Sequence, residues 1–159
     1  MSETRVGLGI DLHRYVGEDE ARPLVLGGVR FDEERGLKGH SDADAVAHAV
    51  CDAMFGAAGM GDIGSHFPDT DARYASIDSL VLVRETAAIL AGAGWHLVNA
   101  DCTVVAERPR LVDAREEMIE NLSRNAGGSV HVKATRPEGL GALGRLEGVA
   151  CLAVVLIER

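Results

Sequence analysis

The chain has 159 residues, of which 47% are hydrophobic and 26% are charged, so its length and composition are those of one globular domain with its own core. The formal net charge is −9 and only 4% of the residues are aromatic, which argues against nucleic-acid binding. No window approaches the length of a membrane span and no signal peptide is recognisable, so we expect a cytoplasmic protein without membrane partners.

Three cysteines are spread along the chain at Cys51, Cys102 and Cys151. Their number is odd, no Cys-x-x-Cys pair occurs, and most of their neighbours are apolar. This pattern predicts reduced thiols in the core rather than a disulfide framework or a zinc ribbon.

The first half of the chain predicts a strand, a hairpin and a helix. Apolar runs bounded by turn residues place the strand over residues 5–12 and the hairpin over 23–31, with its turn at Gly27-Gly28. A polar loop over 33–39 follows. Residues 42–55 are rich in alanine and carry apolar side chains at helical spacing, which predicts a helix.

The second half begins with a loop over residues 62–71, and a helix over 77–90 is expected next, with Ser76 as its cap. The remaining elements are expected to be a strand over 95–107, a helix over 111–125, a strand over 130–135, a loop over 136–148 and a strand over 149–158. This order favours an α+β fold, a mixed β-sheet with helices on one face plus a small hairpin, in a single domain over residues 1–159.

Asp11 and His13 stand two residues apart at the end of the first strand, so their side chains point to the same side. In the predicted helix, Asp44, His48 and Asp52 lie four residues apart along one stripe. Two ligands from the strand and one from the helix would complete an Asp-His-His set around a divalent metal, with a coordination position left open for chemistry. The same residues are also compatible with ordinary surface and helix-supporting roles, and their spacing does not decide between the two.

Four motifs together indicate a known family. They are Gly9-Ile10-Asp11-Leu12-His13, Gly39-His40-Ser41-Asp42-Ala43-Asp44 with His48, Gly61-Asp62-Ile63-Gly64 and Phe67-Pro68-Asp69-Thr70-Asp71. From about Val6 to the last strand, the chain resembles the 2-C-methyl-D-erythritol 2,4-cyclodiphosphate synthases of the non-mevalonate isoprenoid pathway. The resemblance implies a homotrimer with active sites between neighbouring subunits.

The implied substrate is 4-diphosphocytidyl-2-C-methyl-D-erythritol 2-phosphate. Its 2-phosphate would attack the β-phosphorus of its own diphosphate, release CMP and close the cyclic diphosphate, which makes the enzyme a metal-dependent phosphorus-oxygen lyase. The resemblance assigns zinc to Asp11, His13 and His48, and a second divalent ion, magnesium or manganese, to Glu138. Attacking and leaving groups lie in one molecule, so the protein needs only to fold the substrate and neutralise its charge.

The resemblance also gives roles to the remaining site residues. His40 and Ser41 would lie beside the 2-phosphate, Asp62 and Gly64 would bind ribose hydroxyls, and Asp69 would bind the methylerythritol hydroxyls. The neighbouring subunit would frame the cytosine with Ala106, Pro109, Arg110 and Leu111, and would place Lys133, Ala134 and Thr135 opposite the phosphates. Arg145 and Glu147 would line a cavity on the trimer axis that takes an anion or an isoprenoid diphosphate. No role is implied for His66, His96 and His131, which are expected to be surface or strand residues.

The chain departs from the family pattern after Thr135, where Arg136-Pro137 replaces the usual threonines. Arg136 could bind phosphate through two hydrogen bonds or crowd the site, and Pro137 has no backbone N–H to offer. Ala142 stands near a position where the family often has an aromatic residue of the central cavity. Two other functions stay open, the first because of the open metal position and the second because of the Arg136-Pro137 departure. One is a metal-dependent phosphohydrolase with Asp44 as its base, and the other is a non-catalytic trimer that binds isoprenoid diphosphates.

Overall fold

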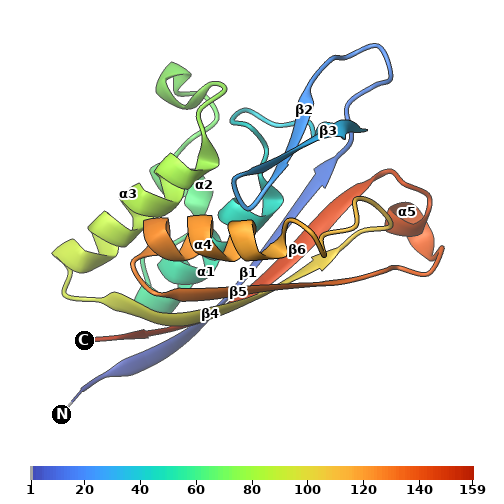
Figure 1. Cartoon of the computed structure of the whole chain (residues 1–159). Coiled ribbons are helices and arrows are strands. Elements are labelled where there is room, and N and C mark those ends of the chain that lie inside the picture. The colour runs from blue at the N-terminus through green and yellow to red at the C-terminus, as the bar shows by residue number, and fades with distance from the viewer. Residues whose placement is uncertain (1) are drawn as a thin grey trace.

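The computed structural model describes residues 2–159, which form a four-stranded sheet, a separate hairpin and a layer of helices (Figure 1). The sheet has the order β1-β6-β4-β5, and the hairpin consists of β2 and β3. The strands are β1 (Thr4–Arg14), β2 (Pro23–Leu26), β3 (Val29–Arg35), β4 (His96–Val105), β5 (Ser129–Thr135) and β6 (Gly148–Glu158). The helices are α1 (Ala45–Ala58), α2 (Ile63–His66), the 3-10 turn η1 (Ala72–Tyr74), α3 (Ser79–Gly92), α4 (Arg115–Ala126) and α5 (Gly141–Gly144).

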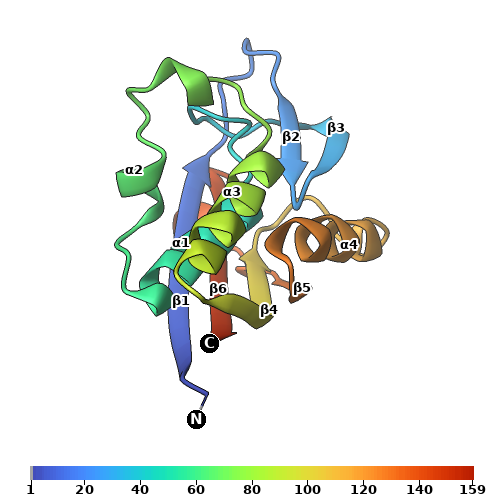
Figure 2. The same cartoon turned by 90° about the vertical axis from the view of Figure 1, so that its left-hand side faces the viewer.

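The sheet is mixed, as predicted. β6 runs antiparallel to both of its neighbours, β1 and β4, whereas β4 and β5 are parallel. The carboxyl ends of β1, β4 and β5 therefore lie at the same end of the sheet. The hairpin stands beyond the end of β1 (Figures 1 and 2). Helices α1 and α4 pack on one face, and α3 packs against both of them. The α+β architecture with helices on one face is confirmed.

Helix α1 lies directly against β1 because both elements carry small residues where they meet. A Cβ atom at Gly9 would lie 2.1 Å from the backbone oxygen of Ala49, and one at Gly7 would lie 2.1 Å from that of Ala53. Larger side chains would force the helix away from the strand. This close approach brings the first turns of α1, which carry His48, next to the end of β1, which carries Asp11 and His13.

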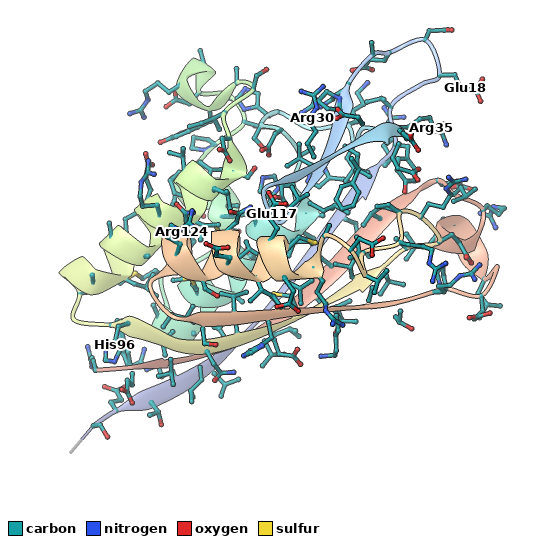
Figure 3. The ribbon with its side chains drawn as sticks, in the orientation of Figure 1. Glu18, Arg30, Arg35, His96, Glu117 and Arg124 are labelled. Carbon is teal, nitrogen blue, oxygen red and sulfur yellow. The ribbon has the colours of Figure 1, made fainter. Side chains whose placement is uncertain are left out.

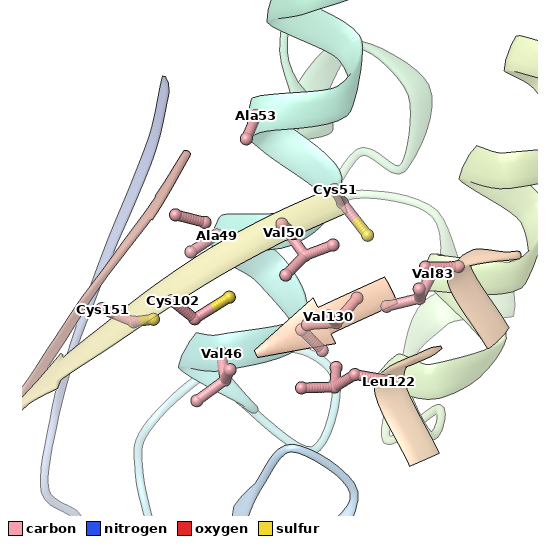
Figure 4. Packing of buried hydrophobic residues seen from close by; sticks show 14 of the residues in the cluster. Val46, Ala49, Val50, Cys51, Ala53, Val83, Cys102, Leu122, Val130 and Cys151 are labelled. Carbon is pink, nitrogen blue, oxygen red and sulfur yellow. The ribbon is translucent and has the colours of Figure 1, made fainter. Parts of the chain in front are cut away.

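The hydrophobic core fills the space between the sheet and the helices. Figure 4 shows Val46 and Val50 of α1 beside Leu122 of α4 and Val130 of β5. All three cysteines are buried in this layer as free thiols, as predicted, and burial raises the pKa of Cys51 to about 12. Such a thiol is protonated and unreactive at neutral pH.

The opposite face of the sheet has no helix over it (Figures 1 and 3). Between Thr4 and Arg14, the outward side chains of β1 are large and apolar, with exposed fractions of 69% at Val6, 58% at Leu8, 50% at Ile10 and 64% at Leu12. Leu152 and Val154 of β6 continue this row. We call these six residues the bare sheet face. Contiguous exposed apolar surface on this scale is unusual for a monomer and marks an interaction surface.

Several local predictions need correction. Ser76 does not cap α3: its own φ is +57°, and the Asp78 side chain instead accepts a hydrogen bond from Leu80 N at 2.8 Å. The predicted loops over 33–39, 62–71 and 136–148 contain the end of β3, helix α2 and helix α5 respectively. Within residues 2–159, no helix is long and apolar enough to cross a membrane.

Asp44 is the cap that joins the hairpin to α1. Its fully buried carboxylate accepts hydrogen bonds from the backbone N–H groups of Val46, Ala47, Gly27 and Gly28, at 2.7–3.1 Å. Burial raises the pKa of Asp44 to about 6, the charge of Asp42 adds to this shift, and the backbone donors oppose it. Both carboxylate oxygens are buried and bonded to backbone N–H groups, so the role of general base proposed for Asp44 in a hydrolase has no support.

We expect Asp44→Ala to lower the free energy of unfolding by at least about 3 kcal/mol, because it removes a helix cap and leaves buried N–H groups without partners. Asp44→Asn keeps one acceptor oxygen and should lose less. Since the pKa of Asp44 in the folded protein is raised above that of an ordinary aspartate, the wild type should lose stability relative to Asp44→Asn as the pH rises through about 6. Urea unfolding followed by circular dichroism measures both effects. An Asp44→Ala variant as stable as the wild type would contradict this account.

Candidate metal centre and substrate cavity

Asp11, His13 and His48 converge between the end of β1 and the first turns of α1. One ligand atom from each lies within 4.8 Å of the other two. His13 Nε2 is 2.9 Å from Asp11 Oδ2 and 3.1 Å from His48 Nδ1, and His48 Nδ1 is 3.6 Å from the same Asp11 oxygen. The predicted Asp-His-His cluster is therefore present, and it could hold a metal ion.

A hydrogen bond to the backbone fixes which ring nitrogen of His13 carries the proton. Its Nδ1 lies 2.8 Å from the backbone oxygen of Lys38, which can only accept a hydrogen bond. Nδ1 must therefore be the N–H donor, and a neutral His13 directs the lone pair of Nε2 at Asp11 and His48. This is the arrangement found in metal-ligating histidines, whose second ring nitrogen is held by a backbone or carboxylate oxygen.

Asp11 supplies an anionic oxygen to the same point. Burial on its own raises the pKa of Asp11, but the imidazoles of His13 and His48 lower it to about 2, so the carboxylate is ionised at neutral pH. Its Oδ2 is buried and accepts no well-aligned hydrogen bond from the described residues. A cation, either a metal ion or an added proton, has to lie among these three atoms. Two imidazole nitrogens and one carboxylate oxygen suit a divalent transition metal such as zinc, and three protein ligands leave a position open.

The segment over residues 39–42 borders this cluster, and Arg22 holds it in place. The Arg22 guanidinium donates to Gly39 O at 2.8 Å and also to Ser41 O. His40, whose backbone oxygen accepts from Ser76 N at 2.8 Å, lies half-buried between these two clamped residues. Ser41 is only 5% exposed, and its Oγ lies 3.0 Å from His48 Nε2. The substrate-binding roles of His40 and Ser41 stay predictions.

A second group of predicted residues lines one open cavity of about 1010 Å³. The predicted members are Ala106, Pro109, Arg110, Leu111, Lys133, Ala134, Thr135 and Arg136. The cavity lies between the carboxyl ends of β4 and β5 and the start of α4, and Arg108 and Arg115 add two further cations to its wall. Its lining combines apolar side chains with five cations, and Asp32, Glu33, Glu34 and Glu107 also line it. Such a mixed lining suits a polar small molecule that carries a ring. The volume is that of a small-molecule site.

The metal cluster and this cavity do not share residues, and the sheet order explains why. β1 and β5 are the two edge strands, so three interstrand spacings separate His13 from Thr135, which amounts to about 14 Å. Both lie at the same end of the sheet, because His13 pairs with Val149, Val105 with Ala150, and Val105 with Thr135. Within one chain the predicted site is thus present as two halves.

The other predicted residues belong to neither half. Asp62 caps α2 by accepting from Ser65 N at 2.8 Å, and hydrogen bonds from the Ser65 hydroxyl and then from this N–H lower the pKa of Asp62. Gly64 lies in that helix, and Asp69 is exposed in the loop that follows. Arg145 pairs with Glu147 at 2.7 Å beside α5. Their assigned roles stay predictions.

Arg136 forms an ion pair with Glu107 in the cavity wall. Arg136 Nη2 lies 2.9 Å from Glu107 Oε2, and Gly139 N donates to Glu107 Oε1 at 2.7 Å. Glu107 thereby holds both ends of the turn that contains Glu138, whose φ is +53°. The Glu138 carboxylate is exposed, and among the described residues no cation lies within ion-pair distance of it. A single exposed carboxylate suits magnesium, which keeps several water and phosphate ligands.

Comparison with known proteins identifies the family. A model of the YgbB family matches residues 4–158. The chain belongs to this family. It is 53% identical to the 2-C-methyl-D-erythritol 2,4-cyclodiphosphate synthase of Rubrobacter xylanophilus, over 100% of this chain and 98% of that protein. Identity to the synthase of the same name from Syntrophomonas wolfei is 52%, over 98% and 99% of the two chains. The resemblance found in the sequence is confirmed.

Several solved structures share the fold. The bifunctional IspDF of Campylobacter jejuni superposes with a TM-score of 0.92 at 38% identity over 99% of this chain, which spans 43% of that longer protein. A CDP-bound 2C-methyl-D-erythritol-2,4-cyclodiphosphate synthase gives 0.85 at 36% identity, over 96% and 99% of the two chains. The CDP complex of IspF from Plasmodium falciparum gives 0.82 at 29% identity, over 97% and 95%.

The sequence analysis missed four residues that hold parts of the candidate site in place, namely Arg22, Asp42, Ser79 and Glu107. Asp42 stands inside a recognised motif, but its role depends on contact with Ser79, which is 37 residues away. Arg22 and Glu107 act through backbone oxygens and a backbone N–H respectively. Such contacts leave no spacing signal in the sequence.

Proposed function

We propose that this protein is a 2-C-methyl-D-erythritol 2,4-cyclodiphosphate synthase whose domain takes up the whole chain. It would convert 4-diphosphocytidyl-2-C-methyl-D-erythritol 2-phosphate to the cyclic diphosphate with release of CMP. The observation that carries the proposal is the convergence of Asp11, His13 and His48 in a chain 53% identical to a synthase of that name. CDP complexes of two structural relatives support a cytidine-diphosphate substrate.

Asp11, His13 and His48 would hold zinc, and Glu138 would hold magnesium or manganese. Bound there, these ions would supply positive charge and Lewis acidity to phosphate oxygens. Lys133 and Thr135 would neutralise and orient the diphosphate from the other half of the site, and His40 and Ser41 would do so for the 2-phosphate. The reacting groups belong to one molecule, so holding it folded supplies much of the rate enhancement.

A homotrimer with shared active sites is part of the proposal. The two halves of the site lie about 14 Å apart at opposite edges of one sheet. A neighbouring copy could bring its cavity to the metal cluster, so that Ala106, Pro109, Arg110 and Leu111 would frame the cytosine base. The bare sheet face supports such an assembly, because closed symmetry would bury its apolar side chains. Arg145 and Glu147 would then face an axial cavity for an anion or an isoprenoid diphosphate.

The decisive experiment is to incubate the zinc-loaded protein with the diphosphocytidyl substrate and magnesium, and to identify the products by phosphorus NMR. We expect CMP and the cyclic diphosphate in equal amounts. CMP with a linear phosphate product would instead make the protein a phosphohydrolase. A folded, zinc-loaded protein that releases no CMP would refute the synthase proposal.

Arg136 is expected to be tolerated in catalysis because Glu107 neutralises its guanidinium. Replacing it with threonine, the residue usual in the family, should therefore change kcat/KM by less than about tenfold. Glu107→Ala should have the larger effect, because it removes both carboxylate oxygens, releases Arg136 and Gly139 N, and so loosens the turn that bears Glu138. Steady-state kinetics over a magnesium titration compares the two variants. A much larger loss in Arg136→Thr would show that Arg136 contacts the reacting phosphates directly.

A further inference from the structure

His48 is held from behind by two residues outside the metal cluster. Its Nε2 lies 2.9 Å from Ser79 Oγ, and Ser79 Oγ in turn donates a hydrogen bond to Asp42 Oδ1. Ser79 is fully buried in the first turn of α3, 31 residues beyond His48 in the sequence. A buried hydroxyl on the far nitrogen of a candidate ligand is placed to control that ligand.

The direction of these hydrogen bonds follows from what each group can donate. Asp42 accepts from Ser79 N at 3.1 Å through one oxygen and from Asp44 N at 3.2 Å through the other, so both of its oxygens act as acceptors. The single hydroxyl proton of Ser79 therefore points to Asp42. The Ser79 oxygen presents a lone pair to His48, so Nε2 must carry the ring proton. Nδ1 is left with its lone pair facing Asp11 and His13.

Ser41 is the one other hydroxyl near Nε2 in the described chain, at 3.0 Å. If Ser41 donated to Nε2, that nitrogen would carry no proton and its lone pair would face the Ser79 lone pair at 2.9 Å, which is repulsive. Ser41 Oγ also accepts from Ala43 N and lies 3.2 Å from Ser79 Oγ. The consistent arrangement therefore has Nε2 as donor and Ser79 as its acceptor.

The backbone keeps this contact in place. Asp42 N donates to Ile77 O at 3.0 Å, and Ser76 N donates to His40 O at 2.8 Å. These bonds join the segment before α1 to the segment before α3, so Ser79 and His48 cannot move apart independently.

We propose that Ser79, oriented by Asp42, is a positioning residue that sets the ring orientation and the protonated nitrogen of His48 so that Nδ1 faces the metal. This inference deepens the proposed function and rests on its metal site, but it does not depend on the identity of the substrate. The hydrogen bonds from Asp42 through Ser79 act on His48 alone, since Lys38 O already holds the His13 ring.

The first test needs no variant. Nitrogen-15 NMR of the metal-free wild-type protein distinguishes protonated from unprotonated ring nitrogens. We expect the neutral His48 ring to be protonated at Nε2 and unprotonated at Nδ1. A neutral His48 with its proton on Nδ1 would overturn the proposal.

The second test measures zinc affinity by competition with a chromophoric chelator at constant pH, without substrate. We expect Ser79→Ala and Asp42→Asn to weaken zinc binding by about 10–100-fold. Asp42→Asn should also shift the His48 proton, because an amide that donates to Ser79 Oγ lets the Ser79 hydroxyl turn toward Nε2. Thr86→Val is the matched control, because it removes another buried hydroxyl of α3, one that donates to Leu82 O at 2.8 Å about two helical turns beyond Ser79.

The outcomes separate this inference from the proposed function. A zinc affinity within about threefold of the wild type in either folded variant would overturn the positioning role. An equal loss in Thr86→Val would also overturn it, because the loss would then reflect a general loosening of α3. A wild type that binds zinc and releases no CMP would refute the synthase and leave the positioning role intact. Saturating zinc should restore turnover in Ser79→Ala, as expected for a residue that acts through His48.

Discussion

Replacing His48 with alanine is expected to abolish high-affinity metal binding and to lower kcat by about 10³-fold, because a bound metal stabilises the transition state by several kcal/mol. His48 supplies one of only two nitrogen ligands in the cluster, and it is the one that comes from α1. Without it, Asp11 and His13 are two adjacent ligands on one strand, which cannot surround an ion.

The fold should survive this change. His48 lies at the end of the core beside Ser41 and Ser79, and the contact of α1 with β1 depends on Gly7, Gly9 and the alanines that face them. His48→Ala should therefore unfold in the same cooperative manner as the wild type. Metal content by mass spectrometry of the purified protein and CMP release are the two readouts.

His96→Ala is the matched control for this prediction. His96 is exposed at the start of β4 and pairs with Glu158 at 2.9 Å, at the end of the sheet away from the metal cluster (Figure 3). An exposed ion pair of this kind contributes at most about 1 kcal/mol. Treating the wild type with a chelator should reproduce the His48→Ala loss, and added zinc should reverse it in the wild type but not in the variant. Full metal content and activity in His48→Ala would refute the assigned site.

The metal cluster was one of two interpretations that the sequence allowed for Asp11, His13 and His48, and their convergence has a simple physical reason. Asp11 and His13 face the same side of any strand, and His48 lies in the first turns of a helix whose alanines allow it to approach that strand closely. Alternation, helical periodicity and residue size are all visible in the sequence. The convergence of the three residues in space needed only the additional fact that α1 packs on β1.

The remainder of the site depends on contacts that no local pattern encodes. Ser79 reaches His48 because α3 is joined by backbone hydrogen bonds to the segment before α1, and Glu107 reaches Gly139 across two neighbouring strand ends. The failed prediction of Ser76 as a cap has the same origin. The backbone N–H of Ser76 donates to His40 O, and the helix begins only after Asp78, whose side chain caps it.

The split between the metal cluster and the cavity leads to the second large effect, which concerns mixed oligomers. His48→Ala damages one half of the proposed site, and Lys133→Ala damages the other, so each variant alone should be nearly inactive. If a site takes its metal from one subunit and Lys133 from the next, mixing the two variants creates some sites with both halves intact. Random exchange in equal proportions should restore about a quarter of wild-type activity, since each half is intact with even odds.

Mixing should be done by joint refolding, or by co-expression with two different affinity tags, so that subunits redistribute. A mixture with no more activity than its separate components would place both halves of the site in one subunit and refute the shared site. The bare sheet face supplies the control. Introducing Ile10→Asp into both variants puts a charge in the middle of the apolar row, where burial without a partner is costly. The doubly substituted chains should elute as monomers and show no recovery, because activity regained by mixing requires assembly through this face.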